Sequence, residues 1–202
     1  MSRGLGDVYK RQVPIDIPNC DTDQIIPARF LRHDSDAPDY DRFLFHDLRF
    51  EADGSEKPSF IYNKEPYRGG KILVADINWG CGSSREAAVS VLVANGIRPV
   101  IAPSFGDIHY NNCLKNGVLP IRLSREECDT IRAHLHEAPG AEIDIDLDTQ
   151  TVTTLNGTKF KFEIGKFDKE CLMNGVDDIG LTQSHDADIA AFEKDRPEYA
   201  WL

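Results

Sequence analysis

The residues best suited to chemistry form one short stretch, GCGSSRE at positions 80–86. A glycine-flanked turn between a strand and a helix presents free backbone N–H groups, and the helix dipole adds partial positive charge there. Ser83 and Glu86 also have the S-x-x-E spacing of a capping box, which by itself describes an ordinary helix start. Arg85 argues against that simple interpretation, because a cation in a first helical turn opposes the dipole by about 0.3–1 kcal/mol. We interpret the turn as a carboxylate site, with Arg85 as a bidentate ligand.

Two other stretches are weaker candidates. The sequence DTDQIIP at positions 21–27, followed by Arg29, is as typical of an Asx turn or a helix N-cap as of a binding site. The stretch 104–117 is rich in asparagine, and helix capping explains most of it, so we expect it only to support the site. His109 within it is isolated, and we interpret it as a packed side chain.

The elements that must position these residues alternate along the chain. Short apolar runs at 71–77, 99–103 and 118–123 predict buried strands, and helices are expected at 83–94, 106–116 and 124–137. Such alternation indicates an α/β layered domain with a mostly parallel sheet core. Beyond residue 140 the pattern changes to alternating strands at 142–147, 151–155 and 158–164. Asn156-Gly157 predicts a type I′ turn, and so a C-terminal β-hairpin, with two short helices near 167–174 and 187–194.

Composition limits the class of protein. The chain has 202 residues and a formal net charge of −11, which argues against a nucleic-acid or anionic-membrane partner. No apolar run reaches the roughly 20 residues that span a bilayer. Five scattered cysteines without a C-x-x-C pair indicate reduced thiols, a cytoplasmic protein, and no metal bound by this chain. We expect one domain over residues 13–202, preceded by a disordered or non-native leader at 1–12.

The segment 33–58 differs from its surroundings by its many aspartates. Its spacing fails the calcium-loop pattern, and Pro38 falls inside the would-be loop. Connections of this length are usually functional or disordered, and we interpret this one as a lid that faces the substrate.

Three motifs in order, DTDQIIP at 21–27, GCGSSRE at 80–86 and APSFGDIHYNNCLKNGVLP at 102–120, resemble the small subunit of bacterial 3-isopropylmalate dehydratase. The resemblance extends over residues 14–202. It implies the layered, swivelling β/β/α-type domain of the aconitase superfamily. It also implies a hydro-lyase that is active only as a heterodimer with a large subunit, and that subunit would carry the 4Fe–4S cluster.

The resemblance also implies an activity and roles for residues. The reaction would be the isomerisation of 2-isopropylmalate to 3-isopropylmalate through isopropylmaleate, in leucine biosynthesis. Ser83 would be the base, Ser84 a donor to the substrate and Arg85 the carboxylate clamp, while Asp23 would orient the serine or the small dicarboxylate substrate. Further substrate contacts are expected from Asp21, Thr22, Arg29, Leu31 and Arg32.

Other functions remain open at this point. The same motifs would serve a homoaconitase or a methylmalate-type hydratase, because the side-chain pocket lies in the variable lid. In a different class, Cys81 between two glycines could be a thiol nucleophile for amide hydrolysis. A third alternative is an anion-binding module without catalytic activity.

Overall fold

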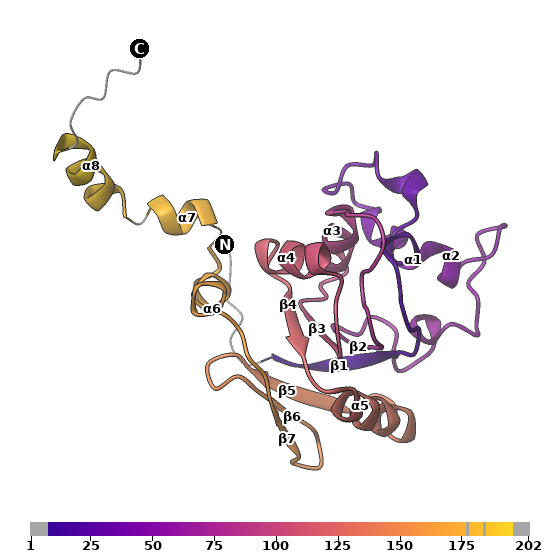
Figure 1. The fold of residues 1–202 in the computed structure, drawn as a ribbon. Helices are drawn as coiled ribbons and strands as arrows, with labels where there is room; N and C mark the ends of the chain where they lie inside the picture. The colour runs from indigo at the N-terminus through magenta and orange to yellow at the C-terminus, as the bar shows by residue number, and fades with distance from the viewer. Residues whose placement is uncertain (1–7, 177, 184, 196–202) are drawn as a thin grey trace.

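The computed structural model describes residues 8–176, 178–183 and 185–195, and its centre is one seven-stranded sheet of order β4-β3-β2-β1-β5-β6-β7 (Figure 1). The pairs among the first four strands are parallel, whereas β1–β5, β5–β6 and β6–β7 are antiparallel. The predicted mixed sheet with a parallel core and a C-terminal hairpin is therefore confirmed. The strands are β1 (Val8–Ile15), β2 (Ile72–Ala75), β3 (Pro99–Ala102), β4 (Leu119–Arg122), β5 (Glu142–Asp146), β6 (Thr151–Thr153) and β7 (Lys159–Lys161).

Strand β1 joins the two halves of the sheet, which corrects the prediction of a leader over residues 1–12. Gln12 pairs with Ile72 of β2, and Arg11 pairs with Glu142 of β5. Three polar residues in succession, Lys10, Arg11 and Gln12, interrupt the apolar pattern of this strand, so its periodicity did not reveal it. The predicted boundary at residue 12 is wrong, because the domain includes residues 8–12; residues 1–7 lie outside the described residues.

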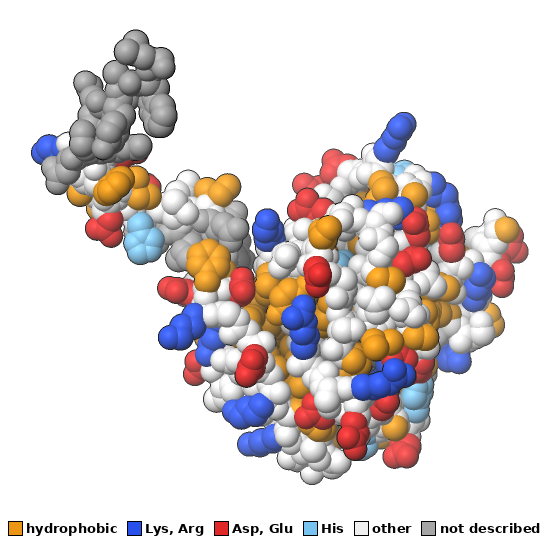
Figure 2. Space-filling model, viewed as in Figure 1, with side chains coloured by type: hydrophobic (Ala, Val, Ile, Leu, Met, Phe, Trp, Pro, Cys, Tyr) orange, Lys and Arg blue, Asp and Glu red, His pale blue; other side chains and the backbone are white. Residues whose placement is uncertain are grey.

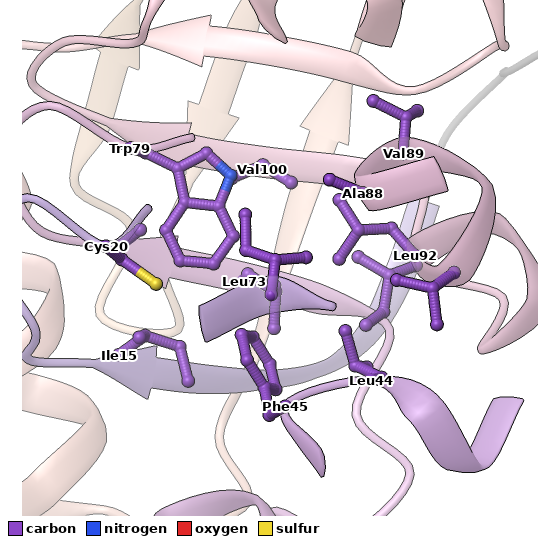
Figure 3. Packing of buried hydrophobic residues seen from close by; sticks show 14 of the residues in the cluster. Ile15, Cys20, Leu44, Phe45, Leu73, Trp79, Ala88, Val89, Leu92 and Val100 are labelled. Atoms are coloured by element: carbon purple, nitrogen blue, oxygen red, sulfur yellow. The ribbon is translucent and has the colours of Figure 1, made fainter. Parts of the chain in front are cut away.

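Helices cover both faces of the sheet. Helices α3 (Ala87–Ala94) and α4 (Asp107–Lys115) pack on one face, and α5 (Arg125–Glu137) packs on the other. Two apolar clusters result. Figure 3 shows the first, in which Trp79, Leu73 and Phe45 lie among the side chains of α3. The second contains Ile131 and Leu135 of α5. Shorter helical turns are α1 (Thr22–Ile25), η1 (Ala28–Phe30), η2 (Tyr40–Phe43), α2 (His46–Arg49) and η3 (Ile61–Asn63).

The segment 33–58 is anchored rather than loose. Tyr40, Phe43, Leu44 and Phe45 are buried in the first apolar cluster, so this part of the segment is held against α3. Two short helical turns, η2 and α2, form within this segment. Burial of four large side chains restricts how the segment could move as a lid.

The C-terminal region agrees with the predicted elements except in two details. The turn at 154–158 is not type I′, because Gly157 (φ +81°) has a positive φ but Asn156 does not. Thr154 N–H donates to Thr158 O over 2.9 Å, which gives a three-residue loop with glycine in the left-handed position. An additional short helix, α7, lies between the two that were predicted.

Of the last three helices, the first packs at the sheet through Leu172, which belongs to the second apolar cluster, and the other two extend away from it (Figure 1). They are α6 (Lys166–Asn174), α7 (Asp178–Gln183) and α8 (Asp186–Asp195). Figure 2 shows hydrophobic side chains on the surface of this arm, and Phe167, Ile179 and Phe192 are among the exposed large hydrophobic residues. No helix among the described residues is long and apolar enough to cross a membrane.

Candidate active site

The chain segments that follow β1, β2 and β3 meet at the carboxyl ends of these parallel strands. Cys81 forms an isolated bridge with Asp21, and Trp79 forms one with Phe105. Gly80 N–H donates to Cys20 O over 2.8 Å. The three segments therefore continue the sheet as one irregular layer. Ligands of open α/β sheets bind in this position, outside the carboxyl ends of the strands.

Two glycines allow the second and third segments to touch. Gly80 has φ +67°, and a Cβ added there would lie 2.3 Å from the ring of His109. A Cβ on Gly106 would lie 2.7 Å from Gly80 O. Both distances are shorter than any real Cβ contact, so the close approach requires glycine at both positions.

A pocket of about 310 Å³ lies between these segments. Ser83, Ser84 and Arg85 form part of its wall together with Thr22, so the structure brings these predicted residues together. Both serines are exposed, and the carbonyl oxygen of Ser83 accepts a 2.8 Å hydrogen bond from Thr22 Oγ1. The complete lining is Thr22, Gly80, Cys81, Gly82, Ser83, Ser84, Arg85, Gly106, Asp107, Ile108 and His109.

The guanidinium of Arg85 forms an ion pair with Asp23, although the two residues are far apart in sequence. The Arg85 side chain is 14% exposed, so its charge faces the pocket from a fixed position. The hydrogen bond from Arg85 lowers the pKa of Asp23, and the same contact raises the pKa of Arg85. Asp23 also accepts a hydrogen bond from the N–H of Ala28 over 3.1 Å. Asp23 is not among the lining residues of the pocket, and its ion pair with Arg85 favours the ionised form of both side chains.

The predicted capping box at Ser83 and Glu86 is wrong. Helix α3 begins at Ala87, and Glu86 is its N-cap without a side-chain hydrogen bond to the backbone. The carboxylate of Glu86 instead accepts a 3.2 Å hydrogen bond from Asn116 Nδ2. Because Arg85 precedes the helix, the argument that it opposes the dipole of its own first turn does not apply. The interpretation of an anion site rests instead on the position of Arg85 in the pocket wall.

The other predicted contact residues lie outside the pocket wall. Asp21 caps helix α1, where its carboxylate accepts a 2.8 Å hydrogen bond from Gln24 N–H. Arg29 forms an ion pair with Asp47 and lies over the ring of Phe30. The remaining two, Leu31 and Arg32, are exposed and are not part of the pocket lining.

Sequence reasoning missed the contribution of the third segment. Gly106, Asp107 and Ile108 line the pocket, and His109 is packed as predicted but lies in the pocket wall. Burial lowers the pKa of His109 to about 4, so its ring is neutral at physiological pH. The sequence did contain a signal for this wall. If the predicted strands at 71–77 and 99–103 are parallel neighbours, the segments that follow them must lie side by side at the same edge of the sheet.

Cys81 does not have the environment of an activated nucleophile. Its thiol donates to Asn19 O over 3.3 Å, and burial raises its pKa. A nucleophilic thiol requires the opposite shift. Within the described part of the chain, no three His, Cys, Asp or Glu side chains are grouped so that they could hold a metal ion.

Comparisons with known proteins identify the family. The model described as Aconitase C-terminal domain matches residues 7–126, and a second model, LeuD_N, matches residues 129–165. A Gluconobacter oxydans protein named 3-isopropylmalate dehydratase small subunit is 47% identical over 94% of this chain and 90% of its own length. One of the same name from Rhodopseudomonas palustris is 49% identical over 93% and 94%. The chain belongs to the family of 3-isopropylmalate dehydratase small subunits.

A solved structure supports the same family. The crystal structure of a 3-isopropylmalate dehydratase from Methanocaldococcus jannaschii superposes with a TM-score of 0.66 and 25% identity, and covers 92% of this chain and 98% of its own. The resemblance to 3-isopropylmalate dehydratase small subunits that three motifs predicted is thus confirmed, and so is the fold that it implied. The pocket described above lies within the region that the Aconitase C-terminal domain model matches.

Proposed function

We propose that this chain is the small subunit of a hydro-lyase that converts 2-isopropylmalate to 3-isopropylmalate through isopropylmaleate, in leucine biosynthesis. The observation that carries the proposal is the pocket in which Ser83, Ser84 and Arg85 lie together, in a chain 47–49% identical to curated small subunits. The partner is a large subunit with a 4Fe–4S cluster, and the two chains form a heterodimer. No disulfide links the cysteines in the part of the chain that the structure describes, which supports a reducing compartment such as the cytoplasm.

In this mechanism the small subunit supplies the base and holds the substrate. Ser83, as an alkoxide, removes the proton from the carbon beside a carboxylate. Arg85 binds a substrate carboxylate, and its positive charge favours the ionised form of Ser83. Ser84 donates a hydrogen bond to the substrate. The cluster of the partner supplies a Lewis acid for the hydroxyl group.

Three more residues act by position. Thr22 fixes the backbone of Ser83 through the hydrogen bond to its carbonyl oxygen. Asp23 holds the Arg85 guanidinium at the pocket wall. Asp21 supports both by capping the short helix on which Thr22 and Asp23 lie. A general base in a fixed position contributes about 10²–10⁴-fold to the rate.

The experiment is anaerobic reconstitution. The purified chain is mixed with a cluster-loaded large subunit, and the ultraviolet absorbance of isopropylmaleate is followed for the wild type and for Ser83→Ala. We expect turnover by the wild type and a loss of at least about 100-fold in the variant. Ser90→Ala is the matched control, because Ser90 Oγ donates only to Glu86 O within α3 and does not line the pocket.

Each alternative gives a different result. A silent wild type with an intact cluster would reject the substrate assignment, and turnover of a methylmalate-type substrate or homocitrate would then identify the related hydratase. Full activity of Ser83→Ala would reject the base. Loss of activity in Cys81→Ala, with Ser83→Ala unaffected, would favour the thiol mechanism.

A further inference from the structure

Two asparagines with a left-handed backbone are bonded to each other just before the pocket segments. Asn19 (φ +54°) follows β1, and Asn78 (φ +61°) follows β2. A positive φ is uncommon outside glycine, although asparagine tolerates it better than most residues do. Asn78 Nδ2 donates to Asn19 Oδ1 over 2.9 Å, and Asn19 N–H donates to Ile77 O over 2.9 Å. Backbone and side chain together therefore join the two segments at this point.

Asn78 also contacts the third segment of the site. Its N–H donates to Ser104 Oγ over 2.9 Å, and the N–H of the next residue, Trp79, donates to Ser104 O over 2.9 Å. Asn78 thus has hydrogen bonds both to the segment after β1 and to the segment after β3. Neither asparagine is among the lining residues of the pocket. Residues that their surroundings hold in an unfavourable backbone conformation cluster at functional sites.

The junction of the two asparagines is the first of a series of bonds that leads to Ser83. The thiol of Cys81 donates to Asn19 O over 3.3 Å, and Thr22 N–H donates to Cys81 O over 3.1 Å. Thr22 Oγ1 then donates to Ser83 O over 2.8 Å. The asparagines therefore fix the beginning of the segment that carries Ser83, and Thr22 fixes its far end. A rotation at the junction would shift the Ser83 hydroxyl within the pocket.

We propose that Asn78, through its hydrogen bond to Asn19, is a positioning residue that places the Ser83 hydroxyl for the reaction. It acts only through the geometry of the segment that it begins, because it does not line the pocket. Misplacement of a catalytic group by about 1 Å can cost roughly 100-fold in rate. This role rests on the proposed function, because it assumes that Ser83 is the base.

A matched pair of variants tests the position of the lost bond. Asn78→Gly removes the side chain and keeps the backbone conformation, because glycine adopts a positive φ readily. Gln150→Gly is the control: Gln150 (φ +53°) also donates one 2.9 Å side-chain hydrogen bond, to Phe162 O, but it lies between β5 and β6 and does not line the pocket. Both variants should fold, as checked by urea unfolding, since each loses one hydrogen bond and one unfavourable conformation.

The expected result in the reconstituted enzyme is a change in kcat. Asn78→Gly should lower kcat about 10–100-fold and change KM little, because Ser83 acts in the transition state while Arg85 still binds the substrate carboxylate. Gln150→Gly should change neither constant. Asn19→Gly should lower kcat by a similar factor, and the double variant should lose no more than either single variant, because both remove the same bond.

The conservative variant Asn78→Asp should retain most of the kcat, because the Asn19 amide can turn and donate to the new carboxylate. Unchanged kcat in Asn78→Gly would overturn the positioning role. So would equal losses of kcat in Asn78→Gly and Gln150→Gly, or additive losses in the double variant, because the effect would then be independent of the bond between the two asparagines.

A measurement without turnover separates this inference from the proposed function. In the isotope-labelled full chain, the amides of Trp79 and Gly80 donate to the neighbouring segments, and their hydrogen exchange reports how firmly the segment is held. Exchange should be about 10-fold faster in Asn78→Gly and unchanged in Gln150→Gly. If the wild type shows no turnover, the proposed function fails, whereas unchanged exchange in Asn78→Gly would show separately that the asparagine does not hold the segment.

Discussion

Protonation of His109 links the stability of this chain to pH. Burial lowers the pKa of this side chain from 6.5 to about 4 in the folded state. Between these two values the unfolded chain binds a proton that the folded chain does not, so the free energy of unfolding falls as the pH falls. From pH 7 to pH 5 the loss from this one group is about 2 kcal/mol, and it approaches about 3 kcal/mol below pH 4.

The assay compares urea unfolding at pH 7 and pH 5 in the wild type and in His109→Gln, which does not titrate. Other groups titrate in this interval as well, so the informative quantity is the difference between the two proteins. The decrease in unfolding free energy should be about 2 kcal/mol smaller in the variant. His185→Gln, which replaces an exposed histidine, should behave as the wild type. If His109→Gln lost as much stability as the wild type, the ring would not be buried in its neutral form, and the packing over Gly80 would be refuted.

Three further predictions use matched pairs. Gly80→Ala should cost more unfolding free energy than Gly157→Ala, because both have positive φ but only Gly80 faces the His109 ring; equal losses in urea unfolding would contradict this. Ser124→Ala should lose about 0.5–2 kcal/mol of stability by removal of a helix cap, whereas Ser83→Ala should lose almost none, as checked by urea unfolding. Thr22→Val should lower kcat in the reconstituted enzyme, whereas Thr130→Val, which removes a similar 2.8 Å hydrogen bond on α5, should leave kcat unchanged.

The S-x-x-E pattern occurs twice in the chain, and it forms a capping box at one place but not at the other. Ser124 and Glu127 form the capping box that their spacing predicts, and α5 begins directly after them. Ser83 and Glu86 have the same spacing, but no capping box forms there. The Ser83 carbonyl is held by Thr22, from a segment about 60 residues earlier, and Arg85 turns towards Asp23. A local pattern carries no information about partners that only the folded chain brings near.

The elements that were predicted well are those with strong local signals. Apolar runs identified the parallel strands β2, β3 and β4, and the change of periodicity after residue 140 identified β5, β6 and β7. Strand β1 was missed because the polar run Lys10-Arg11-Gln12 interrupts its apolar pattern. The site was predicted correctly where its residues share one turn, as Ser83, Ser84 and Arg85 do. The first turn of α4 was missed as part of the pocket wall, because the fold alone brings it beside the segment that follows β2.

The position of β1 also determines how this chain folds. Gln12 pairs with Ile72, 60 residues later, and Arg11 pairs with Glu142, 131 residues later. A contact between residues so far apart in sequence forms only after the chain has lost the conformational entropy of closing a large loop. Such contacts therefore slow folding. At about 5–20 residues per second, a ribosome needs roughly ten seconds to synthesise the chain from β1 to β5. Strand β1 has no neighbour until β2 is made and only β2 until β5 is made, so the edge that β5 will cover stays exposed to other chains. Strand β1 is thus paired along both edges only after β5 has been made, and that second pairing is what joins the two halves of the sheet.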